Sequence, residues 1–272
     1  MAGDQAGKTA FIGVGVMGET ILAGLLRSGR PVGDFIVGVR RQERGDELAT
    51  KYGVTVLPNL DAAASADTVV LGMKPQDLAG ALQEIAPVLR PGQLLVSLAA
   101  GITTAFIETH VPGGVAVVRV MPNTPALVDE GMHALSAGSH CDEAHLVEAE
   151  GLLGATGKVV RIAEKLQNAA TAVSGSGPAY IFYVVEAMID AGVMLGLPRP
   201  LATELAVQTL YGSATMLRET QQHPTILREQ VTSPGGTTAA ALRYLEDHKV
   251  KAAFLSAMEA CRDRAQQLAA DS

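Results

Sequence analysis

Two glycine-rich segments carry the residue types best suited to bind negatively charged groups. One, GVGVMG at residues 13–18, follows a short apolar run. The other, TSPGGTT at residues 232–238, precedes a run of good helix formers. The first backbone amides of a helix have no intrahelical partner, and the positive end of the helix dipole lies behind them. Both segments are therefore predicted to open helices where a phosphate or a carboxylate could bind.

The segment at residues 13–18 has the spacing of a dinucleotide-binding turn. Gly13 permits a tight turn, Gly15 lets the backbone approach a pyrophosphate, and Gly18 lets helix and strand pack closely. The pattern alone is weak, because glycine-rich turns are common. Here it lies between an apolar run at residues 9–12 and a helical stretch, so we expect a dinucleotide cofactor.

The residues after the second apolar run indicate which dinucleotide binds. NAD-selective sites usually carry an acidic residue about 20 positions beyond the glycines. Here Arg40 and Arg41 stand in that place, and the first acid, Glu43, comes later. Two guanidinium groups favour a 2′-phosphate. We therefore expect NADPH, with NADH as the alternative cofactor, and the competing interpretation of the arginines is an exposed basic turn.

Two further loops follow apolar runs and should face the same crevice, because ligands of open α/β sheets lie beyond the carboxyl ends of the strands. These loops are GMKP at residues 72–75 and SLAAGIT at residues 97–103. The small residues Ala99 and Ala100 leave room for a nicotinamide ring. Lys74 is equally consistent with a solvated surface lysine.

The second glycine-rich segment predicts a grip for a small carboxylate. Gly235 and Gly236 form a tight loop, and the hydroxyls of Thr237 and Thr238 stand at its mouth, before a predicted helix at residues 239–246. The competing interpretation is an ordinary helix start with Ser/Thr caps.

The N-terminal half alternates short apolar runs with helical stretches, which indicates a mostly parallel sheet covered on both faces. We expect an α/β fold in which residues 1–163 form a Rossmann-type NADP-binding domain. Strands are predicted at residues 9–12, 34–39, 54–56, 68–71, 94–98, 115–120, 133–136 and 159–162. Helices are predicted between them at residues 19–28, 44–52, 75–86, 103–109 and 143–155.

The C-terminal half, residues 164–272, contains no further strand pattern and is predicted to be an all-α dimerisation and substrate domain. Its helices are expected at residues 163–172, 178–195, 199–221, 225–231, 239–246 and 250–268. The stretch at 178–195 has apolar residues around most of its circumference, so it should pack against several partners. About 110 residues of helix offer limited mutual cover, so a dimer formed through this half is expected.

Composition excludes several classes of protein. A net charge of −7 and a pI near 5.4 argue against a nucleic-acid surface. Cys141 and Cys261 have no metal-binding or CxxC spacing, and His140 and His145 near Cys141 are predicted to be surface residues, so no metal site is expected. The sequence shows neither a signal peptide nor an uninterrupted apolar stretch of about 18 residues. A cytoplasmic protein is expected.

Six segments together make the sequence resemble pyrroline-5-carboxylate reductases over almost its whole length. They are FIGVGVMGE, MKPQD, SLAAGIT, RVMPNTPALVDEGM, AVSGSGPAY and HPTILREQVTSPGGTTAAALRYLE. The last is similar to that family's signature and is far more specific than the glycine pattern. The resemblance implies a Rossmann domain, a helical dimerisation domain and dimers that often assemble into decamers. It also implies reduction of 1-pyrroline-5-carboxylate to L-proline with NADPH or NADH, the last step of proline biosynthesis.

The resemblance implies roles for individual residues as well. The implied cofactor contacts are Gly13, Val14, Gly15, Val16, Met17, Gly18, Arg40, Asn59, Met73, Lys74, Pro75, Ala99 and Ala100, to which the residue pattern adds Arg41. The candidate substrate contacts are Ser176, Gln221, Ser233, Gly236, Thr237 and Thr238. The substrate carboxylate would lie on the backbone of residues 236–238, and the Thr238 hydroxyl would reach the ring nitrogen. Gln221 stands where some relatives carry a glutamate, so a proton-handling carboxylate is not expected there.

Two other functions remain open at this stage. One is a related Rossmann-plus-helical reductase of the β-hydroxyacid or ketopantoate type, which typically places a catalytic lysine on a helix of the second half. Lys165, Lys249 and Lys251 are the lysines there, and none lies in a supporting motif. The other is a non-catalytic nucleotide sensor that keeps the fold.

Overall fold

Eight short strands form one sheet in the N-terminal part of the chain, of which the computed structural model describes residues 7–270. The strand order is β3-β2-β1-β4-β5-β6-β7-β8, and every neighbouring pair is parallel except β6 and β7. The strands are β1 (Thr9–Ile12), β2 (Phe35–Gly38), β3 (Thr55–Leu57), β4 (Thr68–Leu71), β5 (Leu94–Ser97), β6 (Ala116–Met121), β7 (Gly131–Ala137) and β8 (Gly157–Arg161). The predicted mostly parallel α/β sheet is confirmed, with strand ends within two residues of expectation.

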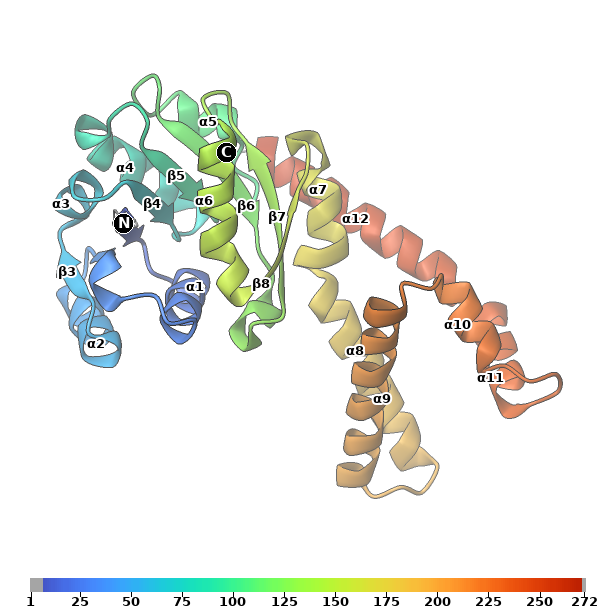
Figure 1. Ribbon diagram of the computed structural model, residues 1–272. Helices are drawn as coiled ribbons and strands as arrows, with labels where there is room; N and C mark the ends of the chain where they lie inside the picture. Colours follow the sequence, from blue (N-terminus) through green and yellow to red (C-terminus); the bar gives the residue numbers. More distant parts are fainter. Residues whose placement is uncertain (1–6, 271–272) are drawn as a thin grey trace. The chain divides into compact units, whose positions relative to one another are not determined.

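Helices cover both faces of this sheet because consecutive strand residues point to opposite sides (Figure 1). Phe11 packs against one face's helices, α1 (Val16–Arg27), α2 (Gln42–Tyr52) and α6 (Glu143–Leu153). Ile12 packs against the other face's helices, α3 (Asn59–Ala64), α4 (Pro75–Ile85) and α5 (Thr104–Glu108). Each side therefore has its own apolar core, built from Ala, Val, Leu and Ile with few aromatic rings.

The chain packs as two compact units. The first contains the chain through Ser176 together with the residues from Cys261 onward, and the second is Gly177–Ala260. The two points where the chain passes between units adjoin each other, since Cys261 Sγ donates to Ser176 Oγ at 3.3 Å. The domain boundary expected between residues 163 and 164 stays a prediction; the division into packed units falls at Ser176 and Gly177.

The second unit is helical. It holds α8 (Gly177–Met194), α9 (Arg199–Thr220), α10 (Pro224–Gln230), α11 (Thr237–Asp247) and the first part of α12 (Val250–Ala270). Among the described residues of this unit, the buried apolar side chains are Ala202 and Ala206, and no residue of α8 is buried. One helical stretch, Glu164–Met194, is long and apolar enough to cross a membrane by length and composition alone, and only 6% of its most apolar window is buried within this chain.

Two local expectations differ from the structure. The six-residue helix α3 was not predicted, because a short Ala-rich segment after Pro58 resembles a loop. The segment at residues 163–172, expected as one regular helix, is instead a 3₁₀ turn (Glu164–Leu166), the short helix α7 (Gln167–Ala170) and a π-helical turn (Thr171–Gly175). Glu164 explains the irregular start, because its carboxylate accepts from the Thr104 backbone at 2.7 Å and pairs with the buried Arg119 at 3.3 Å.

Candidate functional site

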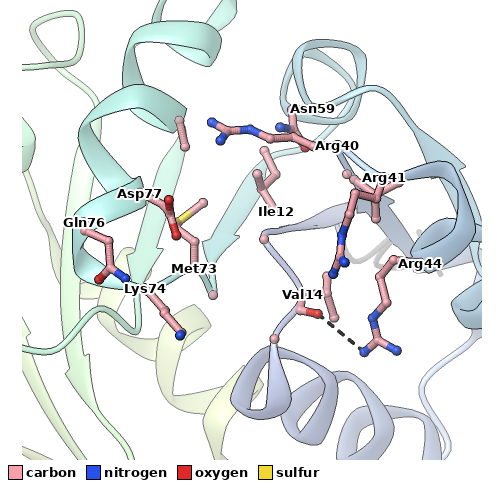
Figure 2. A pocket seen from close by; sticks show the side chains of 16 residues that line it. Ile12, Val14, Arg40, Arg41, Arg44, Asn59, Met73, Lys74, Gln76 and Asp77 are labelled. Carbon is pink, nitrogen blue, oxygen red and sulfur yellow. Dashed lines mark hydrogen bonds between the residues drawn. The ribbon is translucent and has the colours of Figure 1, made fainter.

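A cavity of about 470 Å³ opens at the carboxyl ends of β1, β2 and β4 (Figure 2). This is the edge where open α/β sheets bind ligands, and the volume lies in the usual range for small-molecule sites. Eight of the sequence-predicted cofactor residues line it together: Gly13, Val14, Gly15, Arg40, Arg41, Asn59, Met73 and Lys74. The structure therefore brings together residues that are up to 61 positions apart in the sequence.

The glycine-rich turn has the geometry that its sequence predicted. Gly13 has φ +69°, and a Cβ there would lie 2.7 Å from the Cβ of Met73, so a side chain is excluded by both conformation and space. Gly15 is the N-cap of α1 and has no side chain that could cap the helix. The amides of residues 16–18 consequently make no hydrogen bond within the described part of the chain, which leaves them available to an anion.

Three arginines from the end of β2 and the start of α2 line one wall of the cavity. Arg40 pairs with Glu84 on α4 at 3.6 Å, and Arg44 pairs with Glu19 and, at 3.0 Å, with Glu47. Arg41 forms no ion pair with any residue between 7 and 270. Figure 2 shows Arg40 extending toward α4, whereas Arg41 and Arg44 point toward Val14. The wall therefore carries an excess of positive charge on Arg41.

Glu19, on the first helix, holds the base of this wall. Its carboxylate accepts from Lys51 and from the Tyr52 hydroxyl, each at 2.8 Å, and from Arg44. Burial alone would raise the pKa of Glu19, but the bonds from Lys51, Arg44 and Tyr52 outweigh it and lower that pKa to about 2. Glu19 therefore stays ionised at neutral pH and fixes Arg44 beside the glycine-rich turn, where Arg44 lies 3.5 Å from the Val14 carbonyl oxygen.

Asn59 is the strongest sign that the cavity is built for a polar ligand. The residue is 3% exposed; its Nδ2 donates to Glu84 at 3.1 Å, while its Oδ1 is buried without a hydrogen-bond partner in the described chain. Leaving a buried acceptor unpaired is unfavourable, so a donor on a ligand would satisfy it. A ribose hydroxyl or an adenine amine has this chemistry. The residues present therefore fit a nicotinamide dinucleotide.

Some predicted cofactor residues lie outside this cavity. Val16, Met17 and Gly18 form the first turn of α1, and Pro75 is the first residue of α4. Ala99 is buried and Ala100 exposed, in the loop after β5, and neither lines the cavity. Their contacts with a cofactor stay predictions.

Sequence reasoning missed other lining residues, notably Arg44, Gln76 and Asp77. Gln76 and Asp77 follow the predicted Lys74 and Pro75 directly, so extending that motif by one helical turn would have found them. Arg44 lies in the first turn of α2, three residues after the predicted Arg41. Its partner Glu19 is 25 residues away, and nothing in the sequence pairs the two.

The second glycine-rich segment is also a helix start without a side-chain cap. Gly236 is the N-cap of α11, and its own amide donates to the Ser233 carbonyl at 3.0 Å. The helix begins at Thr237, two residues earlier than expected, so Thr237 and Thr238 occupy its first turn. The amides of residues 237–239 have no acceptor among the described residues. A Cβ on Gly236 would meet Ser233 Oγ, so the serine side chain would have to rotate to make room for one.

The remaining substrate candidates have distinct local roles. Gln221 ends α9 in the left-handed region, with φ +53°, and its side chain is exposed. Ser176 follows the π-helical turn and belongs to the first unit, whereas Gln221, Ser233 and the start of α11 belong to the second. Asn123 supports the π-helical turn, because its side chain donates to the Ser174 carbonyl at 3.1 Å.

Family models match both parts of the chain. Residues 8–101 match a family described as NADP oxidoreductase, coenzyme F420-dependent, and residues 164–268 match one described as pyrroline-5-carboxylate reductase dimerisation. The chain is 44% identical over 263 residues to a pyrroline-5-carboxylate reductase of Corynebacterium melassecola, covering 95% of this chain and 97% of that protein. It is 42% identical to one from Mycobacterium tuberculosis, covering 96% of each.

Solved structures give the same result. A pyrroline-5-carboxylate reductase of Coxiella burnetii superposes with a TM-score of 0.92 at 37% identity, covering 96% of this chain and 98% of that one. The pyrroline carboxylate reductase of Plasmodium falciparum with NADP bound superposes with a TM-score of 0.87 at 29% identity, covering 97% and 99%.

Proposed function

The chain belongs to the pyrroline-5-carboxylate reductase family, and from this premise we propose how its two glycine-capped helix starts divide the reaction. The protein is an NAD(P)H-dependent oxidoreductase that reduces 1-pyrroline-5-carboxylate to L-proline, the last step of proline biosynthesis. The similarity over 95% of the chain carries this conclusion. This similarity favours the pyrroline-5-carboxylate reductase over both alternatives, a β-hydroxyacid or ketopantoate-type reductase and a non-catalytic sensor.

The start of α1 and the arginine wall bind the cofactor in this proposal. The free amides of residues 16–18 hold the pyrophosphate, and the unpaired Oδ1 of Asn59 accepts a hydrogen bond from the adenosine part. Lys74 and Met73 line the opposite side of the cavity, and the small residues Ala99 and Ala100 leave space for the nicotinamide. When bound, the cofactor supplies a hydride.

The start of α11 binds the substrate. The free amides of residues 237–239 hold its carboxylate, with the helix dipole adding to the attraction. The Thr238 hydroxyl accepts a hydrogen bond from the protonated ring nitrogen, which orients C5 of the imine for hydride addition. A threonine hydroxyl does not titrate near neutral pH, so Thr238 positions the iminium and transfers no proton. Ser176, Ser233 and Gln221 complete the proposed substrate contacts.

We further propose that the chain forms a homodimer through the helices of residues 177–260 and that dimers assemble into a decamer. Two observations support an assembly: a dimerisation family matches residues 164–268, and α8 buries none of its apolar residues within the chain. A groove of about 680 Å³ beside α8, lined by Phe182, Tyr183 and Val185, gives a partner helix a place to pack. We place this soluble enzyme in the cytoplasm, away from membranes and nucleic acids.

Replacing Thr238 tests the substrate site. Thr238→Ala should retain NADPH binding but lose about 10- to 1000-fold in kcat/KM for pyrroline-5-carboxylate, the scale of one positioned hydrogen bond. Thr238→Ser keeps a hydroxyl and should recover most of the activity. Thr237→Ala keeps the backbone amide and should stay within about threefold of wild type, because the exposed Thr237 side chain has no role in the proposal. Wild-type turnover in Thr238→Ala would exclude this assignment, whereas absence of any reductase activity in the wild type would exclude the function itself.

A further inference from the structure

The three arginines of the cavity wall differ in how much of their charge is already neutralised. Arg44 contacts two carboxylates, Glu19 and Glu47, and Arg40 contacts one, Glu84. Arg41 is exposed and contacts none in the described chain. A bound dianion would therefore gain most from Arg41, because the other two guanidinium groups must share their charge with carboxylates.

Glu84 holds Arg40 over α4. The carboxylate lies 3.6 Å from Arg40 Nη2 and accepts from Asn59 Nδ2 at 3.1 Å, so two residues that line the cavity meet at one oxygen, Oε2. The guanidinium also lies beside Gly80, one turn earlier on α4, where a Cβ would be in ordinary van der Waals contact with Arg40 Nη2 at 3.9 Å. Arg40 consequently extends along α4, in a different direction from Arg41 (Figure 2).

This arrangement supplies an acidic group that the sequence lacks at the end of β2. Dinucleotide sites that select NAD usually place a carboxylate there, next to the ribose 2′-hydroxyl. In this chain the carboxylate comes from α4: it is Glu84, which pairs with Arg40 in the same wall. Arg40, without this partner, would favour a 2′-phosphate. We propose that Glu84 sets the ratio of NADPH to NADH binding by withholding Arg40 from the 2′-phosphate, and that Arg41 is the main phosphate contact. The proposal rests on the proposed use of this cavity as the NAD(P)H site.

The physical basis is a competition for one guanidinium. A 2′-phosphate carries close to two negative charges, so it attracts Arg40 and repels Glu84, whereas an uncharged 2′-hydroxyl is not repelled by Glu84 and competes only weakly for Arg40. The pair is partly exposed, with side chains 56% and 37% accessible, so its attraction is modest and a phosphate can offset it. Glu84 therefore reduces the affinity for NADPH more than the affinity for NADH, which moves the enzyme toward use of both.

Binding constants of purified full-length variants for NADPH and NADH, measured by calorimetry without the imine, test the proposal. Glu84→Gln removes the charge but keeps an oxygen that can accept from Asn59. It should tighten NADPH binding by about 2- to 5-fold and change NADH binding by less than about 1.5-fold, with the gain fading at high salt. Arg41→Ala should weaken NADPH by about 10- to 100-fold and leave NADH within about twofold.

A double-mutant cycle shows whether Glu84 acts through Arg40. In an Arg40→Ala background, Glu84→Gln should no longer tighten NADPH, because no guanidinium is left to release. Glu43→Gln is the matched control: it removes the same charge from the neighbouring turn, where Glu43 makes no ion pair in the described structure, and should leave the NADPH-to-NADH ratio within about 1.5-fold of wild type.

Three outcomes would overturn the proposal: equal changes for both cofactors in Glu84→Gln, weaker NADPH binding in that variant, or a gain that persists without Arg40. Failure of wild type to bind either cofactor would instead exclude the cavity as the NAD(P)H site. Turnover with pyrroline-5-carboxylate, measured separately, reports on the reaction and not on this ratio.

Discussion

The sheet unit and the helical unit solve the problem of apolar surface in opposite ways. The sheet unit covers its strands with helices on both faces and buries residues such as Phe11, Leu25 and Leu82 almost completely. The helical unit has large apolar side chains as well, but Phe182 is 65% exposed and Leu255 is 69% exposed. Contacts within one chain thus account for the order of the first unit. The second needs cover that one chain does not provide.

This difference also separates the two halves of the proposed active site. Asn59 and Arg44 are fixed by partners in the same unit, through Glu84 and Glu19. Thr238 lies in the helical unit, whose large apolar side chains are exposed in a single chain. Its position should therefore depend on assembly. We therefore expect cofactor binding to survive loss of the oligomer and reductase activity to be lost with it.

The largest expected effect is on assembly. Met188, on α8, is 43% exposed in the chain, and Met188→Glu would bury a charge in the proposed dimer interface. At about 3 kcal/mol for each uncompensated charge and two copies per dimer, association should weaken by about 6 kcal/mol, close to 10⁴-fold. Sedimentation equilibrium measures the subunit mass, and NADPH titration of the same sample should show cofactor binding within about threefold of wild type.

Val147→Glu provides the control for this prediction. Val147 is 55% exposed on α6 of the sheet unit, so it presents a comparable apolar surface outside the proposed interface. This variant should assemble as wild type does. If Val147→Glu dissociates while Met188→Glu remains assembled, the interface lies on the sheet unit. The proposed difference between the two units would then be wrong.

A smaller effect is expected from a cavity in the sheet unit. Leu82 is fully buried between α4 and the sheet, so Leu82→Ala should lower the free energy of unfolding by about 3 kcal/mol. Denaturant unfolding should show this loss with no change in subunit mass. Leu60→Ala on α3, where Leu60 is 38% exposed, is the control and should cost less than about 1 kcal/mol. A change of mass in Leu82→Ala would show that the sheet unit does not hold its fold by its own contacts.

The smallest effect at neutral pH comes from His133, on β7. Its Nε2 lies 3.1 Å from the Thr156 hydroxyl, its Nδ1 is buried without a partner in the described structure, and burial lowers its pKa from 6.5 to about 4. The unfolded chain therefore binds a proton at His133 more tightly than the folded chain does. The contribution of His133 to the free energy of unfolding is fully present above about pH 6.5, and the free energy of unfolding falls by up to about 3 kcal/mol as the pH drops toward 4.

Urea unfolding at pH 7.5 and pH 4.5 measures this loss. His133→Gln cannot take up the proton and should show a smaller difference between the two pH values, whatever its stability at pH 7.5. The loss of the Glu19 contacts belongs to a lower window, between the ordinary pKa of 4.5 and the folded value of about 2. An unchanged difference in His133→Gln would assign the acid response to other groups.

Much of this fold could be predicted from the sequence because its signals are local. The run Thr68–Leu71 is apolar apart from its threonine and is bounded by turns, and Gly13 has the positive φ that a tight glycine turn predicts. The exceptions depend on distant partners. Glu164 bonds to Thr104, 60 residues away, and this contact replaces the regular helix that the sequence between 163 and 172 predicts.

The candidate site divides in the same way. Residues within the predicted motifs, such as Met73 and Arg41, line one cavity, and their contacts with a cofactor stay predictions. Glu84 and Glu19 could not be predicted, because an acid on a helix surface looks like any solvated charge until the fold brings an arginine beside it. Charge pairing across elements determines how the arginines act, and sequence spacing does not encode it.

The contact between Cys261 and Ser176 has a consequence for how the chain could be shortened to an isolated domain. Because the chain leaves and re-enters the sheet unit at neighbouring points, residues 177–260 are an insertion with both ends anchored together. Truncation after Ser176 would also remove the end of α12, whose Leu268 and Ala269 pack near Gly101. Excising residues 177–260 and joining the ends with a short linker would keep that packing and give a nucleotide-binding domain that can be studied alone.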